Sequence, residues 1–354
     1  MNEVTKIDGI GSSVRRTEDK KFLTGKGKYT DDINRPGQVQ AYFLRSDVAH
    51  AKIKKIDIKN AQSAPGVVGV FTGDDIAADK VGGPICGWVV PCRDGSATKE
   101  PPHPLLAQGK VRFVGDAIAV VLAETAEQAK SGAELIDVDY EELSPVVDFE
   151  NAGDGAQIHD EVPNNCYFDW ELGDEKATAD ALSGAKKIVK LRVRNNRLVP
   201  NAMEPRCALA EFDNLDDSYT LHTTSQNPHL TRLVLAAFMF AIPESKLRVI
   251  APDVGGGFGS KIYVYIEEAV CVWASKKVGR PVKWTADRTQ AFLTDCHGRD
   301  HVNDVQLGLD ENNKIVGLRV DTVCNLGAYL SAFSVVVPTY PVSYTHLTLP
   351  TSRS

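Results

Sequence analysis

The sequence predicts an α+β fold in two successive domains. The mixture of strand-like and helix-like runs predicts the class, the length predicts the number of domains, and the composition is that of a globular protein. The chain has 354 residues, a length that corresponds to about two domains. Its content of 43% hydrophobic and 25% charged residues is ordinary for a globular protein. Short strand-like runs alternate with helix-like runs. In chain order we expect a polar lead-in at 1–24, a first domain at 25–150, a linker at 151–165, a second domain at 166–341 and a tail at 342–354.

In the first domain, strands are expected where β-branched and apolar residues gather. A helix is expected to begin at Thr125, because Gln128 stands three residues later in the capping-box position. Glycine and proline predict a long loop at 82–106. The expected strands lie at 38–44, 53–58, 67–72, 111–114, 117–122 and 135–140, with a short helical turn at 60–64.

The linker is predicted from its Gly, Asn, Asp and Pro content, and the second domain again mixes strands with helices. Asn227 followed by Pro228 is typical of an N-cap with proline at the first helical position, so we expect an apolar helix at 228–241. The expected strands lie at 186–195, 219–224, 246–254, 281–285, 304–309 and 315–323.

The most specific feature is the glycine loop, defined here as Gly255 to Lys261, which reads GGGFGSK. It lies between the strand expected at 246–254 and a helix expected at 262–278. Glycines let a backbone approach a ligand closely, and the first turn of a helix offers unpaired N–H groups to anionic or oxo groups. The order strand, glycine loop, helix therefore indicates a ligand cradle, although a ligand-free turn has the same composition.

The common nucleotide motifs fit this loop poorly. The phosphate loop of the form GxxxxGK[ST] fails because Lys261 follows Ser260 and is followed by Ile262. The dinucleotide motif GxGxxG fails because Ser260 stands where its last glycine belongs. Two alternatives remain open at this stage: a nucleotide-binding module that uses the glycine loop as a phosphate cradle, and a non-catalytic scaffold.

The loop sequence resembles the molybdenum-pterin loop of the molybdenum hydroxylases, the superfamily of xanthine dehydrogenase, aldehyde oxidase and aerobic carbon monoxide dehydrogenase. Other segments resemble the large subunit of this superfamily in the expected order, from about residue 8 to residue 340. They are 10–16, 25–32, 44–51, 65–70, 110–116, 138–140, 203–206, 225–227 and 325–329.

The resemblance implies an N-terminal α/β hammerhead domain, followed by the first part of a mixed α/β molybdopterin-binding domain. It also implies an oxidoreductase that hydroxylates a carbon centre of an aldehyde, an N-heterocycle or carbon monoxide with oxygen derived from water. The implied cofactor is molybdenum-molybdopterin in its cytosine dinucleotide form. The implied partners are an iron–sulfur (2Fe-2S) small subunit and an FAD medium subunit, assembled as a dimer of heterotrimers around a small-molecule substrate.

The resemblance assigns the cofactor contacts residue by residue. Gln226 matches a glutamine whose amide contacts a molybdenum oxo group, and Phe258 would also contact the metal centre without ligating it directly. Ile262 stands where purine-hydroxylating members carry an acidic residue, which counts against a xanthine-type substrate. The full set of implied cofactor-binding residues is Gln226, Gly256, Gly257, Phe258 and Gly259.

Three other charged residues have open interpretations. Lys261 either steadies an anionic group or binds loop carbonyls. Glu204 and Arg206, in the segment MEPR, either line the cofactor domain or form buried ion pairs between strands. Glu267 and Glu268 are paired carboxylates near the loop, but neither is assigned as the general base.

The end of the chain bears on catalysis. Val342 to Thr351 reads like a translated sequencing adapter, so we expect the native sequence to stop near Pro341. The general-base glutamate of the family is then expected downstream of this chain, and the catalytic residues are unknown. We therefore expect the chain as printed to be inactive, whatever its parent does.

Composition narrows the partners and the compartment. A formal net charge of −7 argues against a general nucleic-acid binder. No apolar run of about 20 residues is present and the first residues are polar, so we expect no membrane span and a cytoplasmic location. The seven cysteines are widely scattered without metal-ligand spacing, which places the iron–sulfur centres on another chain.

Overall fold

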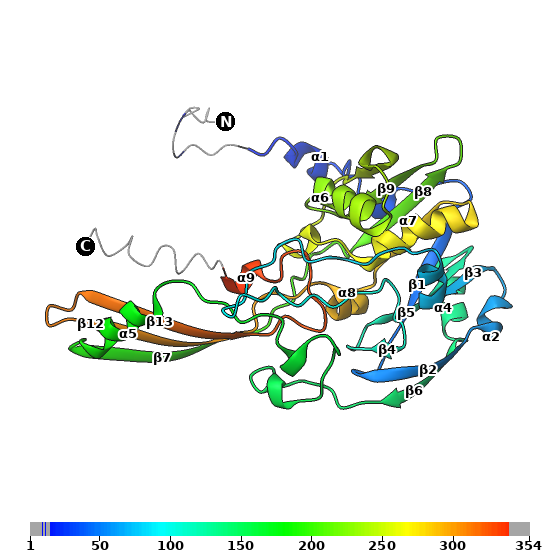
Figure 1. Cartoon of the computed structure of the whole chain (residues 1–354). Helices are drawn as coiled ribbons and strands as arrows, with labels where there is room; N and C mark the ends of the chain where they lie inside the picture. Colours follow the sequence, from blue (N-terminus) through cyan, green and yellow to red (C-terminus); the bar gives the residue numbers. More distant parts are fainter. Residues whose placement is uncertain (1–8, 10, 12–14, 340–354) are drawn as a thin grey trace.

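The computed structural model of the chain describes residues 9, 11 and 15–339 (Figure 1). The adapter-like tail expected at 342–354 lies outside the described residues. Residues 340–341, the last of the predicted second domain, also lie outside them.

A seven-stranded sheet forms the centre of the molecule. Its strands are β1 (Val39–Arg45), β3 (Val67–Thr72), β5 (Ala117–Ala123), β8 (Cys207–Asp213), β9 (Ser218–Thr223), β10 (Leu247–Ile250) and β11 (Val282–Thr285). Their spatial order is β10-β9-β8-β11-β1-β5-β3. Strands β1 and β11 pair in parallel, with Val39 opposite Val282. The sheet therefore passes from the first predicted domain range to the second without a break.

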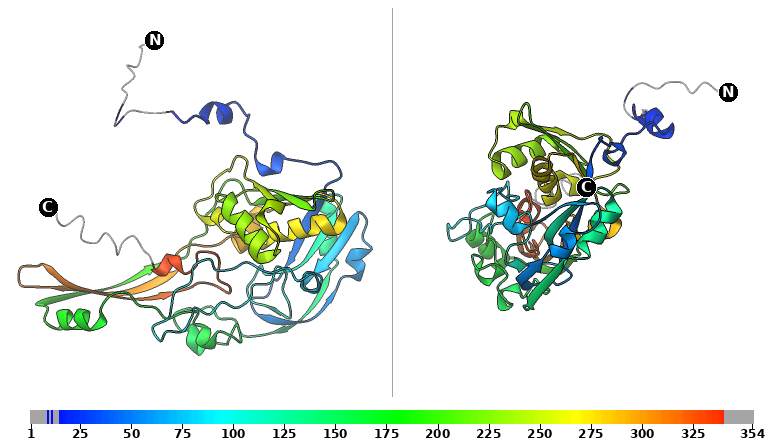
Figure 2. Two further views of the ribbon diagram at one scale, coloured as in Figure 1. Left: turned by 45° about the horizontal axis from the view of Figure 1, so that its top comes forward. Right: turned by 90° about the vertical axis from the view of Figure 1, so that its right-hand side faces the viewer.

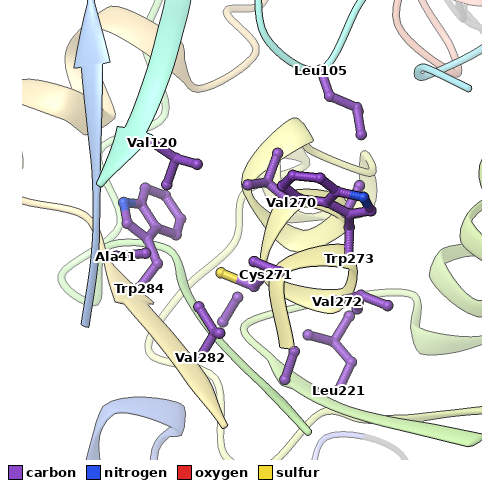
Figure 3. Packing of buried hydrophobic residues seen from close by; sticks show 14 of the residues in the cluster. Ala41, Leu105, Val120, Leu221, Val270, Cys271, Val272, Trp273, Val282 and Trp284 are labelled. Carbon is purple, nitrogen blue, oxygen red and sulfur yellow. The ribbon is translucent and has the colours of Figure 1, made fainter. Parts of the chain in front are cut away.

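The main core lies between this sheet and helix α7 (Ile266–Val278). Nine consecutive residues of α7, from Glu267 to Ser275, are buried, so the helix is enclosed over more than two turns. Trp284 of β11 packs edge-on against Phe43 of β1, with ring centroids 5.8 Å apart. Figure 3 shows Trp284 and Trp273 on the two sides of this packed interior. Burial of so much apolar surface fixes α7 relative to the strands.

Helix α4 (Ala126–Ala133) packs on β1 and β5 and confirms the predicted capping box. The Gln128 amide N–H donates to the Thr125 hydroxyl at 3.2 Å, and the Thr125 N–H donates to Gln128 Oε1 at 3.1 Å. A smaller sheet contains β4 (Lys110–Val111), β2 (Ala51–Asp57) and β6 (Asp137–Glu142) in the order β4-β2-β6. The strand expected at 111–114 is thus only two residues long, because the chain turns at Gly115, where φ is +106°.

A third sheet extends away from the body of the molecule (Figures 1 and 2). It contains β7 (Lys187–Asn195), β12 (His301–Leu309) and β13 (Ile315–Cys324) in the order β13-β12-β7. Helix α5 (Glu175–Ser183) covers one of its faces, where Leu182 lies against Gly308 and Gly317. The absence of side chains on these glycines lets the helix approach the strands closely.

The remaining elements are short. The helix predicted after Asn227 is confirmed by α6 (Pro228–Leu233), which continues as a π-helical segment at Val234–Met239, and Asn227 Oδ1 accepts from the Leu230 N–H at 3.3 Å. The others are α1 (Asp19–Leu23), α2 (Lys59–Gln62), α3 (Gly73–Ala78), α8 (Arg288–Thr294), α9 (Val336–Thr339) and single 3-10 turns at Thr30–Asp32, Ala152–Asp154, Pro163–Asn165, Glu244–Lys246 and Ser260–Ile262.

Two predicted boundaries around the glycine loop are wrong. Strand β10 ends at Ile250, four residues before the expected end, and α7 begins at Ile266, four residues after the expected start. The difference arises because the loop approaches other backbone and side chains instead of pairing in the sheet. Strand β8 was not expected at all, although it lies in the interior of the sheet.

Among the described residues, no helix is long and apolar enough to cross a membrane.

Candidate cofactor site

Two parallel strands bring the predicted site residues to the same edge of the central sheet. Strands β9 and β10 pair in parallel, with Thr220 opposite Arg248 and His222 opposite Ile250. Their carboxyl ends therefore meet at one edge, where ligand sites of α/β sheets commonly occur. Gln226 follows the end of β9, and the glycine loop follows the end of β10.

Gln226 is held by the glycine loop from two sides. Its backbone N–H donates to the carbonyl of Lys261 at 2.8 Å. Its side-chain Oε1 accepts from the N–H of Gly259 at 3.1 Å. This bond directs the amide so that Nε2 remains a donor, and Nε2 has no hydrogen-bond partner among the described residues. The residue is exposed, so this donor is accessible to a ligand.

Gly257 has a steric reason to be glycine. A Cβ at this position would lie 2.3 Å from Gln226 Oε1, which is well inside van der Waals contact. The loop backbone is also unusual, since Gly256, Phe258 and Gly259 have φ values of +96°, +50° and +89°. Phe258 is the one non-glycine residue of these three, and a left-handed conformation at such a residue is the kind of strain that gathers at functional sites.

The loop presents unused backbone donors. Within the described residues, the N–H groups of Gly256, Gly257 and Phe258 donate to no other group. The Phe258 side chain is 73% exposed, and its ring lies beside Gly256. Three backbone N–H groups and the Gln226 amide therefore form a neutral donor set, which suits oxo or phosphate oxygens as acceptors.

Lys261 does not point toward these donors. It is only 2% exposed, and its Nζ donates to the Glu204 carbonyl at 2.8 Å and to Glu204 Oε2 at 3.0 Å. Glu204 Oε2 also accepts from the Gly255 N–H at 2.7 Å. We call Glu204 and Lys261 the loop clamp. Lys261 therefore steadies an anionic group of the protein itself, the Glu204 carboxylate, and the carbonyl that it binds lies outside the glycine loop.

Arg206 belongs to a second group of buried charges, which we call the core charge cluster: Arg45, Arg206, Glu267 and Asp295. Arg206 Nη1 lies 2.7 Å from Glu267 Oε2, and its Nε lies 2.6 Å from Asp295 Oδ1. Arg45 Nη2 lies 2.7 Å from Glu267 Oε1. Burial by itself raises the pKa of the Glu267 carboxyl, but the two guanidinium groups outweigh that effect and lower the pKa to about 2.

Neither paired carboxylate of α7 is available as a general base. Glu267 is fully buried between Arg45 and Arg206. Glu268 accepts from the Thr223 hydroxyl at 2.5 Å and from the Tyr265 N–H at 3.0 Å, and burial raises the pKa of its carboxyl. Both residues are held in the first turn of α7 by protein partners, so the structure gives them a structural role.

The residues present fit the molybdenum-pterin group that the resemblance implied. The exposed Gln226 amide and the free loop N–H groups supply donors for oxo oxygens, and the close approach of Gly257 leaves no room for a side chain there. Glu204 Oε1 is buried without a partner among the described residues. The fold is that of an α+β protein, and its glycine loop and Gln226 form a candidate cofactor site.

Comparison with known proteins identifies the family. The molybdopterin cofactor-binding domain matches residues 158–348. The a/b hammerhead domain of aldehyde oxidase and xanthine dehydrogenase matches residues 24–144. The chain belongs to the molybdenum hydroxylase family, as a large, molybdopterin-binding subunit, and the predictions of family and of α+β class are confirmed.

Several relatives are about one-third identical to this chain over the aligned region. The nicotine 6-hydroxylase large subunit of Paenarthrobacter nicotinovorans is 34% identical over 90% of this chain and 38% of its own length. The carbon monoxide dehydrogenase large chain of Hydrogenophaga pseudoflava is 34% identical over 88% of this chain and 39% of its own. The structure of quinoline 2-oxidoreductase from Pseudomonas putida 86 matches with a TM-score of 0.79 and 34% identity, over 91% of this chain and 40% of that one. The chain thus spans about two fifths of the length of these relatives.

The family resemblance predicted Gln226 and the glycines as site residues, but it left the role of Glu204 undecided. Glu204 reaches the loop from a segment about fifty residues earlier in the chain, and sequence spacing does not reveal such contacts. The only available signal was the MEPR segment itself, whose two charges are unusual beside a strand that proves to be buried.

Proposed function

We propose that this chain forms the part of a molybdenum hydroxylase large subunit that binds the molybdopterin cofactor through Gln226 and the residues Gly256 to Gly259. The observation that carries the proposal is the contact between Gln226 Oε1 and the Gly259 N–H. That contact places the free Nε2 donor beside the unpaired N–H groups of the loop. When bound, the cofactor would supply the two-electron oxidation chemistry of the site, and this chain would supply the hydrogen bonds that orient it.

The nucleotide-binding alternative is not favoured. A phosphate loop would use its lysine to contact phosphate oxygens. Here the Lys261 ammonium is buried and occupied by two oxygens of Glu204. A non-catalytic scaffold would leave the Gln226 amide and the loop without a ligand, and metal analysis distinguishes that case.

The residue directly after Lys261 supports a proposal for the substrate class. Ile262 is half-buried in the 3-10 turn directly after Lys261, so an apolar side chain replaces the acidic group of purine-hydroxylating members. We therefore propose an N-heterocycle, an aldehyde or carbon monoxide as the substrate, and not a xanthine. Oxidation assays with quinoline, nicotine, an aromatic aldehyde and carbon monoxide would separate these classes.

The whole enzyme would need further components. We propose the cytosine dinucleotide form of the cofactor, an iron–sulfur subunit and an FAD subunit as partners in a dimer of heterotrimers, and a cytoplasmic location. By the family resemblance the general base would be a glutamate downstream of the described residues. In keeping with this, both carboxylates of α7 are engaged by protein groups. The boundary between the two domains is proposed at 151–165. Co-purification of the complete large subunit, with flavin and iron analysis, tests these partners.

The central test is the molybdenum content of the complete large subunit, measured by mass spectrometry of the metal. We expect about one molybdenum per subunit in the wild type, and we expect Gln226→Ala to lower molybdenum content or kcat by about tenfold or more, as loss of an oxo-contacting donor does. Asn227→Asp is a suitable control, because it alters the adjacent residue and retains an N-cap oxygen. A wild-type subunit that is folded but lacks molybdenum would refute the proposed function.

A further inference from the structure

We infer that Glu204 and Lys261, the loop clamp, are positioning residues that hold the glycine loop and Gln226 in a cofactor-binding geometry. The inference rests on the proposed function, because it assigns a role at the same site. Neither residue faces the unpaired donors of the loop, so each would act through the groups that it holds.

Glu204 fixes the beginning of the loop. Its Oε2 accepts from the Gly255 N–H at 2.7 Å, and its own N–H donates to the Gly255 carbonyl at 3.2 Å. A Cβ on Gly255 would lie 2.5 Å from Glu204 Cβ, so the glycine is needed for this approach. The first residue of the loop is therefore bound to Glu204 by its donor, its acceptor and its close packing.

Lys261 connects Glu204 to the other end of the loop and to Gln226. Its Nζ donates to the carbonyl and to the carboxylate of Glu204. Its backbone carbonyl accepts from the Gln226 N–H at 2.8 Å. A continuous series of contacts thus runs from Gly255 through Glu204 and Lys261 to Gln226, and it closes the loop between its two ends.

A buried ion pair such as the loop clamp contributes less to stability than apolar packing could. Burying an ammonium and a carboxylate removes both from water, and apolar side chains of similar size often give equal or greater stability. Burial lowers the pKa of the Lys261 ammonium, and Glu204 offsets part of that effect. Each charged group also makes a hydrogen bond to backbone, which an apolar pair cannot do. The geometry therefore favours positioning over packing.

The experiment uses the complete large subunit, purified with its partner subunits, and compares Glu204→Gln, Lys261→Met and the double variant. The thermal midpoint, hydrogen exchange of loop amides, molybdenum content, and kcat and KM are measured for each. We expect the double variant to recover the stability lost in the single variants, because no buried charge is left unpaired. We also expect the loop amides of the double variant to exchange their hydrogens faster than those of the wild type. Its molybdenum content or kcat should be lowered by about tenfold with KM little changed, as for other groups that orient a metal site. A double variant with wild-type loop exchange and molybdenum content would overturn the inference.

Two further variants guard against simple misfolding. Glu204→Asp keeps the charge but shortens the side chain, so it should loosen the loop in a folded protein, and wild-type loop exchange in this variant would also count against the inference. Lys283→Met is the matched control, because Lys283 is likewise buried and its Nζ donates to the carbonyls of Asp31 and Ile33 at 2.6 and 3.2 Å. Lys283→Met should alter stability without changing the hydrogen exchange of the loop amides. If wild-type protein contains no molybdenum, the proposed function fails, while loop exchange still decides the positioning role.

Discussion

The loop clamp and the core charge cluster are both buried groups of opposite charges, yet they hold different parts of the molecule. The core charge cluster joins β1, the start of β8, α7 and α8 through Arg45, Arg206, Glu267 and Asp295. The loop clamp joins a segment before β8 to a loop whose outer side is open, with Phe258 73% exposed. Buried charge alone therefore does not show whether a residue serves the fold or the site; the groups that it contacts do.

The segment MEPR contributes one residue to each group. Glu204 contacts the glycine loop, and Arg206, two residues later, contacts α7 and the end of α8. The Arg206 guanidinium also lies 3.7 Å from the centre of the Tyr265 ring, directly before α7. The same short segment thus anchors both the helix that follows the loop and the loop itself. Changes at Arg206 should affect mainly stability, whereas changes at Glu204 should affect the loop geometry as well as stability.

The largest effect on stability is expected from Glu267→Ala, which leaves Arg45 and Arg206 buried without their shared carboxylate. Removing one partner of a buried ion pair costs about 3–5 kcal/mol of unfolding free energy. Urea denaturation would measure the loss. Lys176→Ala is the control, since its partner Asp180 is also exposed and such a pair contributes about 0.3–0.5 kcal/mol. Equal losses in the two variants would remove the distinction between the core charge cluster and surface pairs.

The second-largest effect is expected from low pH, which should weaken the contribution of the core charge cluster to stability. The ordinary pKa of the Glu267 carboxyl is 4.5, and its pKa in the folded protein is about 2. A lowered carboxyl pKa adds stability that is fully present above the ordinary value and is lost as pH falls through the folded value. The stability advantage of wild type over Glu267→Gln should therefore shrink between pH 4.5 and 2. Unfolding curves at several pH values test this, and a constant difference across that range would contradict the assigned pairing.

A smaller effect on stability is expected from Gly257→Ala. This substitution changes the glycine loop, which the loop clamp holds, and leaves the core charge cluster intact. The added Cβ would lie 2.3 Å from Gln226 Oε1, so the loop or the glutamine must move. Overpacking of this kind costs about 1–3 kcal/mol. We expect the molybdenum content of Gly257→Ala to fall by more than its loss of thermal stability alone would explain. The comparison variant is Gly109→Ala, a position with φ +67° and no atom within 4 Å, where strain acts without a clash. Unchanged molybdenum content in Gly257→Ala would argue that Gln226 does not need its present position.

The sequence predicted much of the fold because the signals were local. The capping box at Thr125 and the N-cap at Asn227 depend on contacts within one helical turn, and both are present. The limits of β10 and α7 were missed because the residues between them belong to no strand and take their conformation largely from contacts with distant residues, among them Glu204 and Gln226. The short apolar strand β8 was missed because a buried central strand has no alternation to distinguish it.

By itself, the sequence determined the α+β class, the family, and the identity of Gln226 and the glycines as the residues of interest, because each of these depends on residue types and their order along the chain. The tertiary structure decided what the buried charges do. It assigned Lys261 to Glu204 and Arg206 to Glu267 and Asp295, since such pairing depends on which atoms meet after the sheet has formed. It also placed Gly255 against Glu204 and Gly257 against Gln226. Folding brings these distant segments together, so that the Gly255 N–H donates to Glu204 and the Gly259 N–H donates to Gln226.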